Sequence, residues 1–160
     1  MTIKPGDTIP AATLFLMTDD GVRKKSTDDL FKGKKVALFG LPGAFTPTCS
    51  AKHVPGFLAN ADALKAKGID SIICLSVNDA FVMGAWGKDQ GVGDNIIMAG
   101  DGSSELTVAM GLQLDRMDGG MGMRCERFSM IVDDGVVSVL NREAPGEFRV
   151  SSAEAMLGQL

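Results

Sequence analysis

The chain has 160 residues, of which 45% are hydrophobic and 22% charged, and its 16 basic and 20 acidic side chains leave a net charge of −4. This composition is typical of a soluble globular protein, and the length suits one domain, which we expect to span residues 1–160. There is no basic cluster to attract nucleic acid, no apolar run long enough to cross a bilayer and no N-terminal signal segment. We therefore expect a cytoplasmic protein without nucleic-acid or membrane partners, although a processed organellar protein would have the same composition.

Turn and capping signals place the expected elements of the first half of the chain. Residues 13–17 and 22–25 flank Asp20-Gly21, a dipeptide typical of β-hairpin turns. Ser26 is the expected N-cap of a short helix after this hairpin. The next expected elements are a buried strand at 36–41, a helix from about Pro47 towards Lys67, a strand at 69–77, a helix from Asp79 to about Lys88 capped by Asn78, a strand at 96–99 and a helix at about 104–110. Because Pro55 cannot donate a helical hydrogen bond, we expect a kink or break there.

The second half of the chain contains another hairpin signal and a final helix. Residues 118–123, rich in glycine and methionine, are expected to form a loop. Asp134-Gly135 separates the apolar residues 128–132 from residues 136–140 and predicts a second hairpin. Ser151 to Glu154 form a capping box that opens the C-terminal helix. Strands that alternate with helices, followed by a late antiparallel hairpin, predict an α/β fold of the thioredoxin-like type, with a central mixed β-sheet flanked by helices.

The loop that ends at Cys49 carries the strongest functional signal. Pro42-Gly43-Ala44-Phe45-Thr46-Pro47-Thr48-Cys49 follows a buried strand and leads into a helix, so Cys49 lies in the first helical turn. Free backbone N–H groups and the helix dipole favour the thiolate there, and the thiolate is the reactive form of cysteine. Thr46 can cap the helix or offer its hydroxyl to a ligand, and Pro42 can form the turn or shield the sulfur from water. The neighbouring threonines and the lack of apolar neighbours favour a positioned nucleophile over an inert core cysteine.

Two other side chains are candidate partners of Cys49. His53 follows it by four residues, on the same helix face if the first turns are regular. A nucleophile–base pair is one interpretation of this spacing, and a locally hydrogen-bonded histidine is the other. A thiolate also needs a cation, and Arg127 stands at the head of the apolar strand 128–132. Spacing alone does not separate Arg127 from Arg124 in this role.

The remaining cysteines limit the other kinds of site. Three cysteines without a Cys-x-x-Cys pair form no disulfide framework, and a single histidine does not complete the usual zinc sites, so no metal is expected. Cys74 lies in a buried strand and is either a small core residue or a redox partner of Cys49. Cys125 lies at a strand edge, where we expect it to be exposed, and no partner is indicated for it.

The residues around Cys49 resemble those of a known family. Pro42, Thr46 and Cys49 form the Pro-x-x-x-Thr-x-x-Cys signature of peroxiredoxins, and residues 40–57 are similar to the peroxiredoxin-5 subfamily, which includes the plant type II enzymes. Residues 74–79 and 127–130 match as well. The resemblance implies a thioredoxin-fold peroxidase that reduces hydrogen peroxide and organic hydroperoxides without metal, haem, flavin or other cofactor, in antioxidant defence and cell redox homeostasis.

The resemblance also assigns roles to the site residues. It implies that Cys49 is the peroxidatic cysteine, which peroxide converts to a sulfenic acid. Thr46 and Arg127 would hydrogen-bond the peroxide and the thiolate, and Pro42 would shield the sulfur. His53 stays a supporting residue nearby.

The way in which Cys49 returns to the thiol stays open. Animal members of the subfamily carry a resolving cysteine near the C-terminus, and residues 147–152 contain none. Cys74 matches the second cysteine of the plant type II pattern, and a one-cysteine cycle with glutathione and glutaredoxin, or with thioredoxin, is equally open. The resemblance further implies a homodimer that packs close to the active sites. The alternative function is a peroxide-sensing regulatory protein, in which oxidation of Cys49 changes the interaction with a partner.

Overall fold

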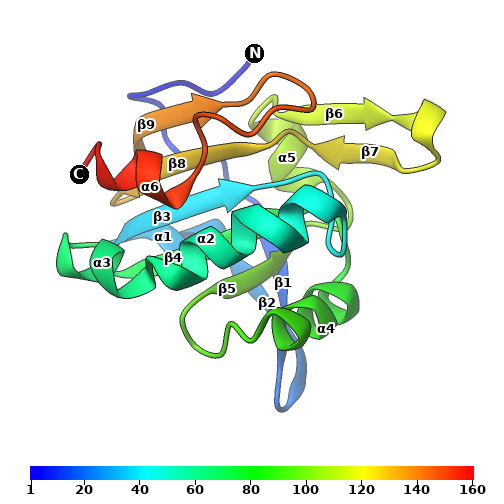
Figure 1. Ribbon diagram of the computed structural model, residues 1–160, viewed down its shortest axis with the longest axis horizontal. Helices are drawn as coiled ribbons and strands as arrows, with labels where there is room; N and C mark the ends of the chain where they lie inside the picture. The colour runs from blue at the N-terminus through cyan, green and yellow to red at the C-terminus, as the bar shows by residue number, and fades with distance from the viewer.

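The computed structural model describes residues 1–160, and its largest element is a seven-stranded mixed sheet (Figure 1). The elements, in chain order, are β1 (Thr13–Thr18), β2 (Gly21–Ser26), α1 (Thr27–Phe31), β3 (Lys35–Gly40), the π-helical turn η1 (Cys49–His53), α2 (Val54–Ala59), α3 (Ala61–Ala66), β4 (Ser71–Ser76), α4 (Ala80–Gln90), β5 (Ile97–Gly100), α5 (Glu105–Ala109), β6 (Gln113–Arg116), the 3₁₀ turn η2 (Met117–Gly119), β7 (Gly122–Cys125), β8 (Phe128–Asp133), β9 (Val136–Arg142) and α6 (Ala153–Leu157). The strand order is β2-β1-β5-β4-β3-β8-β9. The β3–β4 and β4–β5 pairs are parallel and the other pairs antiparallel, so the predicted α/β fold with a mixed sheet is confirmed.

Two apolar clusters cover the two faces of this sheet. Side chains alternate along β3, so that Val36 and Leu38 join one cluster while Ala37 and Phe39 join the other. The first cluster is closed by α1, α5 and the N-terminal segment, and the second by α2, α3, α4 and α6. Both faces of the central strands are therefore buried, which explains their continuous apolar sequence.

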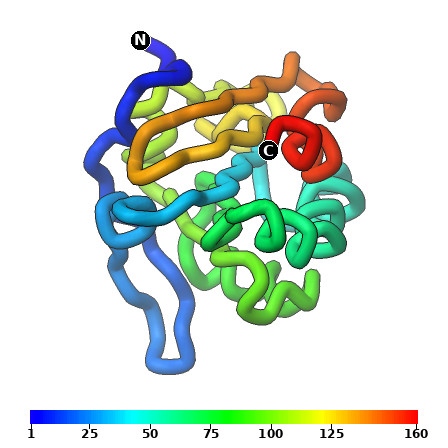
Figure 2. Tube along the Cα trace, turned by 90° about the vertical axis from the view of Figure 1, so that its left-hand side faces the viewer, coloured from blue at the N-terminus to red at the C-terminus, as the bar shows by residue number.

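The hairpins and the first helix confirm the signals read from their sequences. At the β8–β9 turn Asp134 and Gly135 have φ values of 48° and 80°, and residues with positive φ at both central positions define the type I′ turn that suits a hairpin. The Ser26 hydroxyl accepts a hydrogen bond from the Asp29 backbone N–H, and the Asp29 carboxylate accepts one from the Ser26 N–H. This reciprocal pair is a capping box. The β1–β2 hairpin projects from the body of the molecule (Figure 2).

Three local predictions were wrong. The expected loop at 118–123 contains η2 and the start of β7, because β6 and β7 form a small hairpin whose mostly polar, half-exposed strands give no apolar signal. The cap of α4 is Asp79, whose carboxylate accepts from the Val82 N–H, and not Asn78. The cap of α6 is Ser152 and not Ser151, so the expected capping box does not form. Asn78 and Ser151, the two residues that were expected to cap these helices, form hydrogen bonds with other parts of the chain instead.

Two classes of feature are absent from the structure. None of the helices has the length and apolar character needed to cross a membrane. The histidine, cysteine and acidic side chains nowhere gather in threes in a way that could hold a metal ion.

Candidate active site

Cys49 lies where the chain turns from β3 into a helix. Its side chain is fully buried. The backbone N–H groups of Thr48 and Cys49 donate no hydrogen bond within the protein, as expected at the start of a helix, whereas the Ser50 N–H already bonds to the Thr46 carbonyl. The expectation of a cysteine in a first helical turn is confirmed, and these free amides favour negative charge on the sulfur.

The surroundings of Cys49 differ from the sequence-based expectation in one respect. Cys49 belongs to the same buried cluster as Phe39, Leu41 and Val54, so the predicted lack of apolar neighbours was wrong. The local sequence is polar, but the helix lies on the sheet, which supplies apolar contacts from distant parts of the chain. A negative sulfur at this depth needs a cation close to it.

A π turn accommodates the proline inside this helix. The Val54 N–H bonds to the Cys49 carbonyl, five residues back, so the turn at Cys49–His53 is wider than an α-helical turn. Pro55 then occupies the first turn of α2, where a missing N–H costs little. The irregularity expected at Pro55 takes the form of this π turn, and the break in the helix comes later, at Asn60, between α2 and α3.

Arg127 is the cation at the sulfur. Its Nη2 donates to Cys49 Sγ at 3.0 Å, and its Nη1 donates to His53 Nδ1 at 2.8 Å. The guanidinium forms no salt bridge with a carboxylate. Since Arg127 is only partly exposed, the sulfur is the group best placed to balance its charge.

His53 is a hydrogen-bond acceptor for this arginine. Arginine can only donate and the Ser151 carbonyl, 2.9 Å from His53 Nε2, can only accept, so the imidazole carries its proton on Nε2. Burial, followed by the nearby charge of Arg127, lowers the pKa of His53 from 6.5 to about 3. Its Nδ1 is occupied by Arg127 and it makes no hydrogen bond to Cys49, so the structure supports the locally bonded histidine over a nucleophile–base pair.

Arg124 anchors the loop and does not contact the sulfur. Its Nε donates to the Met121 carbonyl at 2.8 Å and its Nη1 to the Pro42 carbonyl at 3.4 Å. The structure thereby separates two arginines that the sequence left equivalent. A Cβ on Gly43 would come within 3.0 Å of the Arg124 Nη1, so the missing side chain at Gly43 makes room for this arginine.

A pocket of roughly 270 Å³ opens beside the loop that leads to Cys49, whose own fully buried side chain does not line it. Its walls come from the loop before Cys49, from Arg127, from the β6–β7 hairpin and from the segment after β9, and they are formed by Pro42, Thr46, Pro47, Thr48, Leu114, Arg116, Met121, Glu126, Arg127, Glu143, Ala144, Pro145, Gly146 and Glu147. The Thr46 hydroxyl donates to the Gly43 carbonyl at 2.7 Å and caps no helical amide, so its oxygen keeps lone pairs for a ligand. The structure thus brings Pro42, Thr46 and Arg127 together around one opening.

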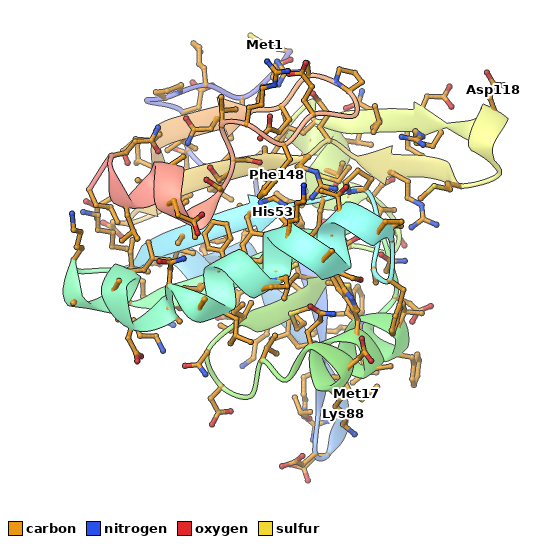
Figure 3. The ribbon with its side chains drawn as sticks, in the orientation of Figure 1. Met1, Met17, His53, Lys88, Asp118 and Phe148 are labelled. Carbon is orange, nitrogen blue, oxygen red and sulfur yellow. The ribbon has the colours of Figure 1, made fainter.

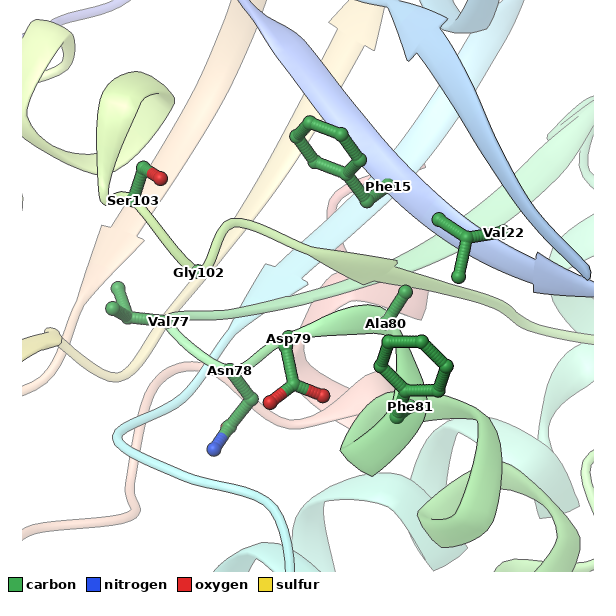
Figure 4. A pocket seen from close by; sticks show the side chains of 9 residues that line it. All are labelled: Phe15, Val22, Val77, Asn78, Asp79, Ala80, Phe81, Gly102 and Ser103. Carbon is green, nitrogen blue, oxygen red and sulfur yellow. The ribbon is translucent and has the colours of Figure 1, made fainter.

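Asn78 fixes the same loop from the other side, a role that the sequence did not reveal. Its Oδ1 accepts from the Ala44 N–H at 3.0 Å and from the Ser76 hydroxyl at 2.6 Å. Figure 4 shows Asn78 beside Asp79, at the edge of a second pocket between β1, β2 and α4. Only the pairing of β3 with β4 brings the Cys49 loop to this asparagine, so no local sequence signal could have indicated the contact.

The other two cysteines are buried without a cation bonded to them. Cys74 lies in β4 on the same face of the sheet as Cys49, and burial raises the pKa of its thiol well above the ordinary value. Cys125 lies at the end of β7 in the opposite cluster, and the expectation that it is exposed was wrong because the β6–β7 hairpin folds its last residue into the core. Burial also raises the pKa of Cys125. All three cysteines are free thiols.

A mixed sheet with helices on both faces and a buried thiol at a helix start, bonded to an arginine, define a thioredoxin-like protein that acts through a cysteine. Comparison with known families agrees with this class. The model of the Redoxin family matches residues 4–157, which is nearly the whole chain.

Individual relatives narrow the class further. Peroxiredoxin-2B of Arabidopsis thaliana is 51% identical over 159 residues, which cover 99% of this chain and 98% of the relative. Among solved structures, reduced Prx3 from Vibrio vulnificus in complex with hydrogen peroxide has a TM-score of 0.95 and 50% identity, with 99% of each chain covered. Peroxiredoxin 5 from Alvinella pompejana has a TM-score of 0.86 and 34% identity, with 97% of this chain and 96% of that chain covered. The chain therefore belongs to the peroxiredoxins, in the peroxiredoxin-5 group with the plant type II enzymes, and is a thiol-dependent peroxidase.

Proposed function

We propose that Cys49 is the peroxidatic residue and that its thiolate reduces hydrogen peroxide and organic hydroperoxides. The observation that carries this proposal is the 3.0 Å hydrogen bond from Arg127 Nη2 to the Cys49 sulfur. In the reaction the thiolate attacks the terminal hydroperoxide oxygen, the O–O bond breaks, and the leaving alkoxide or hydroxide takes up a proton. The products are Cys49 sulfenic acid and an alcohol or water.

The remaining groups at the opening support this step. The Thr46 hydroxyl donates its hydrogen bond to the Gly43 carbonyl, so its oxygen can accept a hydrogen bond from the hydroperoxide and hold the terminal oxygen near the sulfur. Arg127 and the free amides of Thr48 and Cys49 can stabilise the charge that moves onto the leaving oxygen. Pro42, in the wall of the pocket, limits the access of water to the sulfur.

An external thiol is the reductant that fits this arrangement best. The thiolate is the form that attacks a sulfenic acid, and the buried Cys74 and Cys125 both have raised pKa values. Cys125 also lies on the far side of the sheet from Cys49. Glutathione with glutaredoxin, or thioredoxin, would form a mixed disulfide with Cys49, with release of water, and a second thiol would then release Cys49.

Turnover assays and mass spectrometry test these proposals together. Hydroperoxide consumption should be measured with glutathione and glutaredoxin, and separately with thioredoxin, on the wild type and on Cys49→Ser. Cys125→Ser is the matched control, and it should keep the activity. Full activity in Cys49→Ser would disprove the assignment of Cys49. A Cys49–Cys74 disulfide as the main product of a stoichiometric oxidation would instead identify Cys74 as the resolving residue.

The sensor alternative predicts a different kinetic result. A protein that only signals through Cys49 would react quickly with peroxide and then fail to turn over with either reductant. Sustained turnover with one of them excludes that alternative.

Assembly, compartment and domain extent complete the proposal. We expect a homodimer and one domain over residues 1–160. We also expect a cytoplasmic location, and the three free thiols support this location because disulfides are rare in reducing compartments. The relatives include chloroplastic and mitochondrial proteins. Sedimentation of the purified protein tests the dimer, and a single sharp monomeric species would reject it.

A further inference from the structure

The segment that follows β9 is tied down by one buried carboxylate. Glu143 is only 6% exposed, and its two oxygens accept hydrogen bonds of 2.8–2.9 Å from the backbone N–H groups of Arg149, Val150 and Ser151. The Ser151 hydroxyl donates to the same carboxylate at 2.7 Å. Burial alone would raise the pKa of Glu143, but these hydrogen bonds hold it below the usual value. Residues 149–151, which we call the strap, are therefore held by a charged acceptor.

The strap ends at the group that orients His53. The Ser151 carbonyl accepts from His53 Nε2 at 2.9 Å, and this contact leaves Nδ1 without a proton. Nδ1 can then accept from Arg127 Nη1, at 2.8 Å, while Nη2 of the same guanidinium bonds to the Cys49 sulfur. If the proton were on Nδ1, that nitrogen would face the arginine as a second donor and would repel it.

Two further contacts connect Arg127 to Glu143 and to Phe148, the residue that precedes the strap. The Glu143 backbone N–H donates to the Arg127 carbonyl at 3.0 Å, so Glu143 contacts the arginine's backbone as well as the strap. The Phe148 ring lies 5.1 Å from the His53 ring and 5.8 Å from the Arg127 Cζ. Figure 3 shows Phe148 close to His53.

These contacts argue against two simpler roles for Glu143. It lines the same pocket as Thr46 and Arg127, but its oxygens already accept four N–H or O–H donors, so it is poorly placed to act as a base toward a ligand. It forms no salt bridge with Arg127, so it does not orient the guanidinium by direct contact. Its effect on the arginine must pass through the strap and the imidazole.

We propose that Glu143 is a positioning residue for peroxide reduction, which sets the tautomer of His53 through the Ser151 carbonyl and thereby aligns Arg127 with the Cys49 sulfur. The proposal rests on Cys49 being the residue that peroxide oxidises. In Glu143→Gln the negative charge is lost and the amide oxygen can replace only one carboxylate oxygen, so the NH₂ group in the other position faces the Arg149 N–H and cannot accept from it. The strap is then held by weaker, uncharged hydrogen bonds, the Ser151 carbonyl is less firmly placed at His53 Nε2, and the imidazole is less strictly confined to one tautomer.

The test combines NMR of the imidazole with the rate of Cys49 oxidation. His53 is the chain's one histidine, so protein labelled with ¹⁵N at histidine reports this ring alone. The wild type should show a protonated Nε2 and an unprotonated Nδ1. Glu143→Gln should give exchange between tautomers or a large shift of Nδ1, and peroxide should oxidise Cys49 roughly tenfold more slowly. Glu154→Gln, on an exposed glutamate of α6, is the control and should change neither the spectrum nor the rate.

Each outcome decides the proposal. A slower reaction together with a changed imidazole spectrum supports it. A slower reaction with an unchanged spectrum, or an unchanged reaction rate, overturns it. If Glu143→Gln does not fold, Ser151→Ala removes only the hydroxyl donor, and it should shift both readouts in the same direction by a smaller amount; no change in either would overturn the proposal. Failure of the proposed function is distinct, because it would appear as peroxide reduction that survives Cys49→Ser.

Discussion

Cys49 and Cys125 are both fully buried, but they lie on opposite faces of the sheet and in opposite electrostatic surroundings. Cys49 lies at a helix start with free amides and within 3.0 Å of a guanidinium nitrogen. Cys125 has no such cation bonded to it, and burial raises its pKa. Equal burial therefore gives a positioned nucleophile in one region and an inert core thiol in the other.

The difference depends on what compensates a buried charge. A thiolate removed from water is costly unless a cation or hydrogen-bond donors replace the lost hydration. Around Cys49 these donors come from Arg127 and from the first helical turn, which is held in place by the π turn and by Asn78. Experiments on these donors test the contrast between the two cysteines.

Removal of the cation should have the largest effect. We expect Arg127→Ala to slow the oxidation of Cys49 by about a hundredfold to a thousandfold, as when a donor to a developing charge is removed. Arg127→Lys should recover little of the loss, because one ammonium cannot bond to the sulfur and to His53 in the same fork. Stopped-flow fluorescence of Trp86, whose Nε1 donates to the Ser50 hydroxyl next to Cys49, measures the rate.

The exposed Arg23 provides the matched control for this prediction. Arg23→Ala removes the same charge from β2 and should react like the wild type. An Arg127→Ala variant that reacts at the wild-type rate would remove the guanidinium from the mechanism.

The three thiols should also differ in alkylation of the native protein. We expect iodoacetamide to modify Cys49 at least about a hundredfold faster than Cys74 or Cys125, since only the thiolate reacts, Arg127 donates a hydrogen bond to the Cys49 sulfur, and the pKa values of the other two thiols are raised. Peptide mapping over time gives the three rates, and denatured protein should lose the difference. Comparable labelling of Cys125 in the folded protein would contradict the contrast.

His53 should make the folded protein sensitive to acid. Its pKa is about 3 in the folded chain against an ordinary 6.5, so the unfolded chain binds the proton first as the pH falls. This contribution is therefore fully present above pH 6.5 and is lost as the pH decreases towards about 3. Two pH units below the ordinary value, the loss of unfolding free energy should be about 2–3 kcal/mol.

A variant without the imidazole separates the loss of stability caused by protonation of His53 from the loss caused by protonation of the carboxylates. His53→Asn has no imidazole, so urea unfolding over the same pH range should show a loss smaller by about 2–3 kcal/mol. Identical pH profiles for the two proteins would show that the buried imidazole does not resist protonation.

The smallest predicted effect concerns the anchor of the Cys49 loop. Asn78→Ala leaves the Ala44 N–H without its acceptor and the Ser76 hydroxyl with only its longer bond to the Leu41 carbonyl at 3.4 Å, and it should reduce the unfolding free energy by about 1–2 kcal/mol. Urea unfolding measures this loss. Asn95→Ala, at an exposed site without side-chain hydrogen bonds, should be neutral, and an equal loss in both variants would contradict the anchor role.

The fold and the nucleophile could be predicted because their signals are local. Asp134-Gly135 encodes its own turn, Ser26 its own cap, and the loop before Cys49 its own entry into a helix. Arg127 could be proposed from its position at the head of an apolar strand. The choice between Arg127 and Arg124 required the structure, because it depends on which side chain reaches the sulfur across the sheet.

The incorrect predictions concern residues whose surroundings are set by contacts with other parts of the chain. Cys125 looked exposed between charged neighbours, but a hairpin with mostly polar strands carries it into the core. Asn78 and Ser151 both have good capping side chains, yet each bonds instead to a partner distant in sequence, at Ala44 and at Glu143. Pro55 predicted a kink or a break, and the structure has neither a break there nor a regular α-helix, because a wider π turn precedes the proline and the chain continues into α2.

Mass spectrometry after one equivalent of hydrogen peroxide is the most direct test of Cys49 as the reacting thiol. Trapping of the sulfenic acid with dimedone, followed by peptide mapping, should place the modification on Cys49 and leave Cys74 and Cys125 as free thiols. The same treatment of Arg127→Ala should give little adduct in the same time. A sulfenic acid found mainly on Cys74 or Cys125, or equal modification of Cys49 in Arg127→Ala, would contradict the mechanism.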